Sequence, residues 1–253
     1  FFGTLLGTVL AAASAASLNM YFDRDIDALM LRTAMRPLPS GILPPASALT
    51  LGFALAALAW LVLFACGNLL AALLGMASIL YYAVFYTLWL KRRTPQNIVI
   101  GGAAGASAPL IAWAAVTGRL EVPGLMLFAI IFLWTPPHFW ALSLYRREDY
   151  ERAGLPMLPV THGEPETRRQ ILLYSIALVA STLGVAPLAG LGGLYTGTAA
   201  VLGAAFLFAA ARLYRDTATR HAVWLFRFSI LYLFLLFVVM SLDAGLRFGV
   251  STR

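Results

Sequence analysis

Residues 46–90 read ASALTLGFALAALAWLVLFACGNLLAALLGMASILYYAVFYTLWL, a run of 45 positions without an Asp, Glu, Lys or Arg. An α-helix needs about 20 consecutive apolar residues to cross a bilayer, so this run is long enough for two crossings. The pair Gly67-Asn68 divides the run near its middle and favours a turn between two helices. The stretch therefore predicts a membrane-embedded helical hairpin.

The remainder of the chain has the same character. Hydrophobic residues make up 61% of the sequence and charged residues 11%, whereas soluble domains carry about 25% charged residues. Since backbone polar groups in lipid must be satisfied internally, we predict an all-α fold, a polytopic transmembrane helical bundle forming one domain over 1–253. The eight predicted spans lie near 1–20, 46–66, 68–90, 97–117, 124–145, 170–191, 195–214 and 222–247. The chain opens inside an apolar run, so we expect that its N-terminus is truncated.

The charges are distributed unevenly between the two ends of these spans. Threading the spans places fifteen of the eighteen Lys and Arg residues, and nine of the eleven acids, on one side. The positive-inside rule predicts that this side is cytoplasmic, or faces the matrix in a mitochondrion. We therefore expect a multi-pass protein of the bacterial inner membrane, or of the mitochondrial inner membrane in a eukaryote. Topology accounts for the net charge of +7, and no nucleic-acid partner is predicted.

The first constellation of polar residues ends the first predicted span. If that helix runs through Asp27, then Asn19, Asp23 and Asp27 follow at i, i+4 and i+8 and share one face. Carboxylates in a membrane helix are costly unless a cation compensates them, and Mg²⁺ prefers such oxygen ligands. We predict a magnesium site here. The alternative is a solvated helix end in which the acids pair with Arg24 and Arg32.

The second constellation is Lys91-Arg92-Arg93, which ends the third predicted span. Lys91 is the one Lys in a chain with seventeen Arg residues. Because a compact ammonium is a good point-charge partner for phosphate, we predict that Lys91 binds a diphosphate. The alternative is a stop-transfer cluster that only fixes topology.

The third constellation covers residues 134–159. On one continuous helix, His138, Tyr145 and Asp149 would share a face, with His138 about 16 Å deeper in the bilayer than Asp149. We predict that His138 lines a cavity. Alternatively, it hydrogen-bonds to carbonyls freed by Pro136-Pro137.

These residues resemble the UbiA superfamily of intramembrane prenyltransferases over essentially the whole chain. That family has nine spanning helices, so the resemblance implies that a first helix is missing before the eight predicted here. The Asn19/Asp23/Asp27 motif with Arg32-Thr33 and Arg36-Pro37-Leu38 is similar to the motif that binds a prenyl diphosphate through Mg²⁺. The segments 137–140 and 149–159 resemble the branch that farnesylates protohaem IX. Two departures stand out: Met20 replaces an Asp of the broader motif, and Ala153 replaces the second acid expected four residues after Asp149.

The resemblance implies a Mg²⁺-dependent prenyltransferase that moves a farnesyl group from farnesyl diphosphate to a vinyl group of protohaem IX (haem B), giving haem O. Haem B is then a substrate, the bilayer is the solvent, and haem A synthase or an oxidase assembly factor is an implied partner. The implied catalytic residues are Asp23, Asp27, Lys91 and Asp149. The implied substrate-binding residues are Asn19, Arg32, Arg36, Lys91, Arg92, Trp134, His138, Tyr145, Arg146 and Tyr150. The implied metal ligands are Asn19, Asp23, Asp27 and Asp149.

Two rival functions remain at this stage. A quinone-precursor or chlorophyll prenyltransferase would share the fold and metal chemistry and differ only in its acceptor. A polytopic transporter or haem carrier would explain the helices but has no need for an acidic face opposite Lys and Arg.

Overall fold

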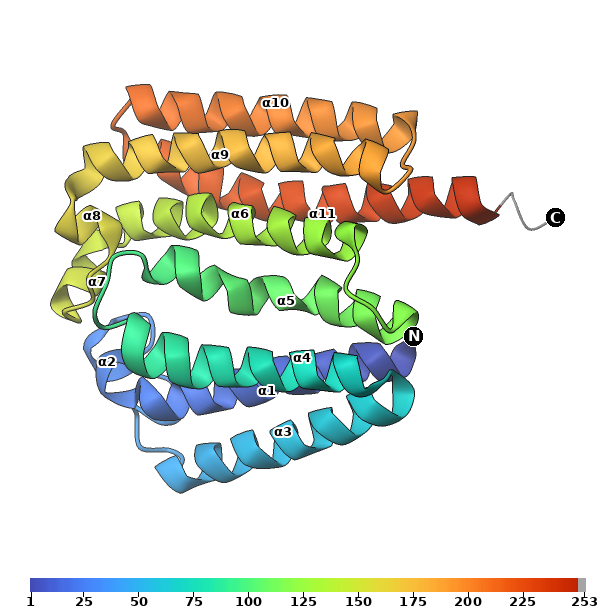
Figure 1. The fold of residues 1–253 in the computed structure, drawn as a ribbon. Coiled ribbons are helices and arrows are strands. Elements are labelled where there is room, and N and C mark those ends of the chain that lie inside the picture. The colour runs from blue at the N-terminus through green and yellow to red at the C-terminus, as the bar shows by residue number, and fades with distance from the viewer. Residues whose placement is uncertain (250–253) are drawn as a thin grey trace.

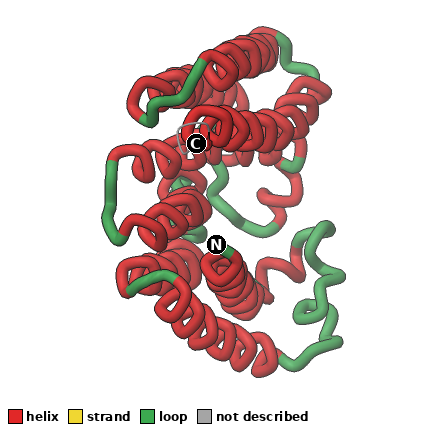
Figure 2. Tube along the Cα trace, turned by 90° about the vertical axis from the view of Figure 1, so that its right-hand side faces the viewer, coloured by secondary structure: helices red, strands yellow, loops and turns green. Residues whose placement is uncertain are grey.

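The computed structural model describes residues 1–249, and this part of the chain contains helices and loops but no strand (Figures 1 and 2). Eight helical segments are long and apolar enough to cross a membrane, as predicted. They are α1 (Phe2–Phe22), α3 (Pro45–Cys66), α4 (Leu69–Leu80) continued by the π-helix η1 (Tyr81–Leu90), α5 (Asn97–Thr117), α6 (Val122–Tyr145), α9 (Gly163–Leu188), α10 (Gly193–Arg215) and α11 (Thr219–Gly249). Three short helices lie in the links: α2 (Arg24–Leu29), α7 (Arg147–Arg152) and α8 (Leu158–Thr161).

The helices run antiparallel, and most pack beside their neighbours in sequence (Figure 1). Small residues bring α1 close to α3, where a Cβ atom added to Gly52 would lie 2.6 Å from the Leu18 side chain. Ser14 donates a hydrogen bond across this interface to the carbonyl of Gly52 at 2.8 Å. Close backbone approach and interhelical hydrogen bonds hold membrane helices together, because lipid removes the hydrophobic driving force between them.

The second half of the chain forms the largest hydrophobic core. Helices α9 and α11 pack against α6, and α10 packs against α9 and α11, around fully buried side chains such as Phe206, Tyr195 and Tyr232. Both tyrosine hydroxyls donate to Thr182, at 2.8 Å to its carbonyl and 3.1 Å to its hydroxyl. This satisfied polar cluster makes α9–α11 a fixed support for α6.

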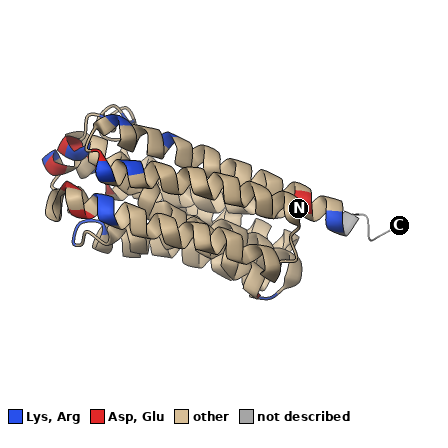
Figure 3. Cartoon of the chain, turned by 90° about the horizontal axis from the view of Figure 1, so that it is seen from above, with Lys and Arg blue, Asp and Glu red and all other residues tan. Residues whose placement is uncertain are grey.

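Charged side chains gather at one end of the bundle (Figure 3). That end of the bundle carries the links 23–44 and 146–162. The first residues of α1 and the last residues of α11 lie at the opposite end of the bundle (Figures 1 and 3). At the sparsely charged end, the buried carboxylate of Asp243 accepts hydrogen bonds from the backbone N–H groups of Gly192 and Tyr195. It thereby caps the start of α10.

One predicted helix boundary and one predicted helix continuation were wrong. Helix α9 begins at Gly163 rather than near 170, because a polar turn with Glu164 and Glu166 starts the helix and no hydropathy pattern reveals it. Helix α6 ends at Tyr145, as predicted for this span, but it does not continue to Asp149, since Arg146 adopts φ −116° and ψ 21° before α7. The single helix carrying residues 138–149 on one face therefore does not exist.

Candidate active site

A cavity of about 530 Å³ opens between α1, η1, α5 and α6 and is closed by the link after α2 and by residues 150–157. This volume lies within the range of small-molecule sites. One part of its wall is charged, with Asn19, Asp27, Arg32, Arg36 and Lys91. The rest consists of small residues of α1 and α5 and of aromatic residues, among them Tyr82, Tyr86, Trp134, Phe139 and Tyr150.

The acidic motif lies at the junction of α1 and α2. Asp23 ends α1 with φ −94° and ψ 6°, so the uninterrupted helix predicted through Asp27 is broken at this residue. The hydrogen-bond ladder nevertheless continues, because the N–H of Asp27 donates to the carbonyl of Asp23 at 2.8 Å. Asn19 and Asp27 line the cavity, while the Asp23 carboxylate lies behind them with 1% of its side chain exposed.

Asp23 is the centre of a buried charge network. Its Oδ2 accepts hydrogen bonds from Asn19 Nδ2 at 2.8 Å and from the ammonium of Lys91. Its Oδ1 is buried without a hydrogen bond, and Arg92 Nη2 lies 3.7 Å from it. Lys91 lines the cavity as well, so the predicted diphosphate ligand is paired with a predicted metal ligand.

The Arg-Thr-x-x-Arg sequence that follows α2 holds Asp27 in place. Thr33 Oγ1 donates to the carbonyl of Asp27 at 2.8 Å, and Arg36 Nη1 lies 2.7 Å from Asp27 Oδ2. Arg32 faces the same cavity, and no ion pair reaches it within residues 1–249. Arg32 is thus the cation of this segment that remains free for an anionic ligand.

Arg92 does not line the cavity. Its guanidinium forms a bidentate pair with Asp25, with both N–O distances at 2.8 Å, and also donates to the carbonyl of Phe22 at 3.0 Å. The hydrogen bonds from Arg92 lower the pKa of Asp25. In this structure Arg92 fastens the end of η1 to the α1–α2 junction, and Lys91 is the member of the basic cluster that reaches the cavity.

The π-helix explains how Lys91 reaches it. In an α-helix of 3.6 residues per turn, nine positions span about 2.5 turns, which would put Tyr82 and Lys91 on opposite faces. In a π-helix, bonded between residues five apart, nine positions span roughly two turns and share a face. The N–H of Lys91 donates to the carbonyl of Tyr86 at 2.8 Å, five residues back, and all three residues line the cavity.

Sequence reasoning missed Tyr82, Tyr86 and Thr87. The two tyrosine rings are stacked with centroids 5.2 Å apart, and Tyr86 fits against Gly101, where an added Cβ would lie 2.3 Å from the ring. Thr87 is fully buried and receives a hydrogen bond from Asn19 at 3.1 Å. No sequence signal distinguishes the π-helical hydrogen bonding from that of an α-helix here. In the structure, Gly101 allows the Tyr86 ring to approach the backbone of α5 closely.

The third constellation is divided by the structure. Trp134 and Tyr150 line the cavity, but His138 does not. His138 is stacked between Trp134 at 4.2 Å and Phe226 at 4.6 Å, and its Nδ1 lies 2.7 Å from Ser229 Oγ of α11. The imidazole therefore joins α6 to α11 directly behind the cavity wall.

The residues after α6 also separate. Arg146 is exposed and lies over the Tyr145 ring at 5.6 Å, and neither lines the cavity. Asp149 is buried, with Arg152 at 3.5 Å. Tyr150 beside it faces the cavity, and burial raises the pKa of this phenol, so its hydroxyl remains a donor at neutral pH.

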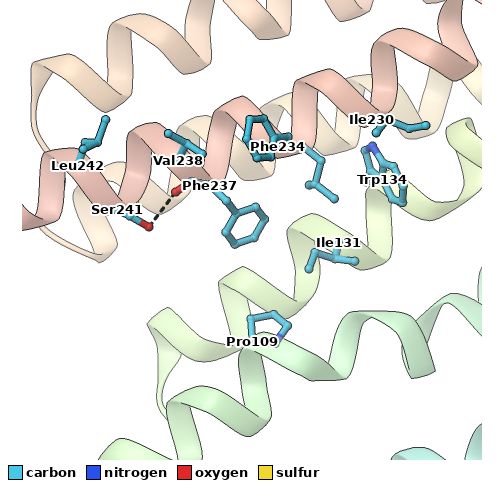
Figure 4. A pocket seen from close by; sticks show the side chains of 10 residues that line it. Pro109, Ile131, Trp134, Ile230, Phe234, Phe237, Val238, Ser241 and Leu242 are labelled. Atoms are coloured by element: carbon cyan, nitrogen blue, oxygen red, sulfur yellow. Dashed lines mark hydrogen bonds between the residues drawn. The ribbon is translucent and has the colours of Figure 1, made fainter. Parts of the chain in front are cut away.

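An apolar groove of about 770 Å³ lies on the outer side of the same wall, between α5, α6 and α11 (Figure 4). Pro109, Phe234 and Phe237 line it, and Ile131 and Trp134 belong to both the groove and the cavity. One layer of side chains thus separates the two spaces.

Known proteins share both the sequence and this architecture. The model of the UbiA prenyltransferase family matches residues 1–242. The chain belongs to this family. A protoheme IX farnesyltransferase from Symbiobacterium thermophilum is 52% identical over 243 residues, covering 95% of this chain and 81% of the relative. A protein of the same name from Parvibaculum lavamentivorans is 50% identical over 252 residues, covering 98% and 79%.

Solved UbiA structures share the fold at low identity. The structure of a digeranylgeranylglyceryl phosphate synthase gives a TM-score of 0.77 at 19% identity, covering 96% of this chain and 92% of that one. A UbiA homolog from Archaeoglobus fulgidus, bound to DMAPP and Mg²⁺, gives 0.58 at 18% identity, covering 94% and 88%.

The residues at the UbiA acidic motif suit a magnesium ion chemically. Asp23 Oδ1 is a buried carboxylate oxygen without a hydrogen bond, and the carboxylate of Asp27 and the amide of Asn19 line the adjoining cavity. No group of three His, Cys, Asp or Glu residues within 1–249 could hold a metal alone, and Asp149 does not join the set. Mg²⁺ is usually bound by one or two carboxylates together with substrate phosphates, which fits this donor set.

Proposed function

We propose that the protein transfers the farnesyl group of farnesyl diphosphate to a vinyl group of protohaem IX, forming haem O and releasing diphosphate. The observation that carries this proposal is the single cavity in which the charged motif and a large apolar, aromatic wall meet. Relatives with about 50% identity over nearly the whole chain are named protoheme IX farnesyltransferases, which supports this choice of acceptor.

The charged wall is the proposed diphosphate site. Lys91 supplies a point charge, Arg32 a planar fork of donors, and the Tyr150 hydroxyl a neutral donor. Asp23, Asp27 and Asn19 would hold Mg²⁺, which supplies charge neutralisation to the departing diphosphate. Thr33 and Arg36 keep Asp27 oriented toward the cavity.

The apolar wall is the proposed farnesyl and haem site. The methyl groups of Ala12 and Ala16 leave room for a prenyl chain, and Trp134 and Phe139 offer flat surfaces that suit a porphyrin. The stacked rings of Tyr82 and Tyr86 face the same space, where their π-electrons can stabilise a developing cation.

The proposed reaction needs no strong general base. The bond between C1 of the farnesyl group and the diphosphate oxygen breaks, and its electron pair leaves with the diphosphate. The vinyl π-electrons form the new bond to C1, which leaves a positive charge on the vinyl carbon next to the porphyrin. One water molecule captures that carbon and loses a proton, giving the hydroxyethylfarnesyl group.

The membrane orientation follows from the charge distribution. We propose that the end carrying the acidic motif faces the cytoplasm of a bacterium, or the matrix if the membrane is mitochondrial, because Lys and Arg accumulate there (Figure 3). Water-soluble farnesyl diphosphate and Mg²⁺ would then enter from that side.

The test is the mass of the product formed by purified protein with farnesyl diphosphate, Mg²⁺ and haem B. We expect haem O and one diphosphate released per haem O, and no product after chelation of Mg²⁺ by EDTA. Asp27→Asn should also abolish product formation, because it removes a charged ligand with little change in shape. Diphosphate release with a quinone precursor but not with haem would refute the proposed acceptor.

A further inference from the structure

The orientation of the Asn19 amide is fixed by two neighbours. Its Nδ2 donates to Asp23 Oδ2 at 2.8 Å and to Thr87 Oγ1 at 3.1 Å. Thr87 has one hydroxyl proton, and it is directed to the carbonyl of Tyr82 at 2.7 Å. The hydroxyl oxygen can therefore only accept from Asn19, and a flipped amide would face two acceptors with its own oxygen.

This orientation leaves the amide oxygen for the cavity. Asn19 lines the cavity, both of its N–H bonds are used, and no hydrogen bond reaches its Oδ1 from residues 1–249. An oxygen is the atom that Mg²⁺ or a metal-bound water requires from an Asn side chain. Partners that orient a ligand in this way tune metal affinity although they do not touch the metal.

Thr87 also belongs to the π-helix. Its bond to the carbonyl of Tyr82 spans five residues, like the backbone ladder that carries Lys91 to the cavity. The Thr87 side chain thus contacts Asn19 of the acidic motif in α1 and also bonds within the π-helix that carries Lys91 to the cavity. Thr87 is fully buried and does not line the cavity, so it can act only through these neighbours.

We infer that Thr87 is a positioning residue, whose hydroxyl holds Asn19 with its oxygen toward the metal–diphosphate site. The inference rests on the proposed function only in taking Mg²⁺ and a prenyl diphosphate as the ligands. It does not depend on which acceptor receives the farnesyl group.

The experiment measures binding of non-hydrolysable farnesyl thiolodiphosphate to the protein in detergent, over a Mg²⁺ titration and in EDTA. Thr87→Val keeps the shape of the side chain and removes the hydroxyl. We expect the Mg²⁺ concentration for half-maximal binding to rise about tenfold, the lower end of the effect of losing such a supporting partner. Binding in EDTA, which depends on Lys91 and Arg32, should be unchanged.

Two control variants separate positioning from packing. Thr87→Ser retains the hydroxyl and should restore the Mg²⁺ dependence of the unmodified protein. Thr167→Val removes another fully buried hydroxyl, which donates at 2.8 Å to the carbonyl of Gly163 in α9 outside the cavity, and should leave binding unchanged.

The inference is overturned if Thr87→Val needs no more Mg²⁺ than the unmodified protein, or if it loses binding in EDTA to the same extent. The second result would assign Thr87 to packing. An unmodified protein that binds the analogue with Mg²⁺ but makes no haem O would refute the proposed function and leave this inference standing. Absence of Mg²⁺-dependent binding in the unmodified protein would refute both.

Discussion

Replacing Lys91 by Met and Asp23 by Asn, singly and together, separates the structural role of their ion pair from its catalytic role. Their side chains are 15% and 1% exposed, so each single substitution leaves the other partner buried with less compensation. Lys91→Met leaves the Asp23 carboxylate without its ammonium partner, and Asp23→Asn leaves the Lys91 ammonium without its carboxylate partner. The double substitution removes both charges.

The expected energies follow from this burial. Losing one partner of a fully buried ion pair costs about 3–5 kcal/mol of unfolding free energy. Asp23 retains its hydrogen bond from Asn19, and Lys91 opens on the cavity, so we expect about 1–3 kcal/mol for each single variant. The double variant should recover about 1–2 kcal/mol relative to the sum of the singles.

Activity should not recover with stability. The two single variants and the double variant all lack a group of the proposed diphosphate and metal site, and we expect kcat/KM to fall by about 100-fold or more in each. Unfolding is followed by SDS titration in mixed micelles, and turnover by haem O production. The solvent-exposed pair Arg169–Glu166, at 3.4 Å, is the matched control and should show no measurable coupling, because water and salt screen it. A double variant with near-normal turnover, or singles without loss of stability, would refute this reasoning.

Three further predictions test other parts of the structure. Gly101→Ala should push the Tyr86 ring into the cavity and lower kcat/KM. Gly197→Ala, in α10 outside the cavity and with no atom within 4 Å of the added Cβ, should change kcat/KM little, and equal losses in the two variants would contradict the close approach. His138→Ala should lower haem O formation and leave Mg²⁺-dependent farnesyl diphosphate binding intact, because the imidazole supports only the aromatic wall; loss of both would indicate separation of α6 from α11. A reporter fused after Arg253 should lie on the periplasmic or intermembrane side, since seven of the eight spans separate it from the link 23–44, and a cytoplasmic reporter would contradict the proposed orientation.

The spans were predictable from the sequence because lipid imposes one simple rule on every helix that crosses it. Runs of apolar residues such as 46–66 mark crossings wherever they occur, and the structure has all eight. The failures occur where helices leave the lipid. The polar turn from Gly163 is helical and Arg146 is not, and both depend on hydrogen bonds and tertiary contacts that hydropathy does not record.

The candidate site was predictable only in part. The spacing of Asn19 and Asp27 predicted that both belong to one site, and both line the cavity. Lys91, which stood out as the one Lys of the sequence, lines it as well. The sequence did not show that Arg92 lies outside the cavity while Lys91 lines it. The direction of each side chain depends on the π-helical hydrogen bonding of η1, which the sequence does not reveal. His138 illustrates the opposite error: a polar side chain deep in a membrane helix has a partner in Ser229, ninety-one positions away, which no local pattern contains.

The charge balance of the cavity explains why the site needs ion pairs before any ligand arrives. Asp23 is paired with Lys91 and Asp27 with Arg36, which leaves Arg32 as the one lining cation without an ion pair in residues 1–249. A prenyl diphosphate carries roughly three negative charges, of which a bound Mg²⁺ offsets two. The one remaining negative charge matches the free Arg32, so Lys91 can move from Asp23 to phosphate without leaving a buried charge uncompensated. A diphosphate that arrived alone would draw Lys91 away and strand Asp23, which is why this arrangement favours the metal and the diphosphate together.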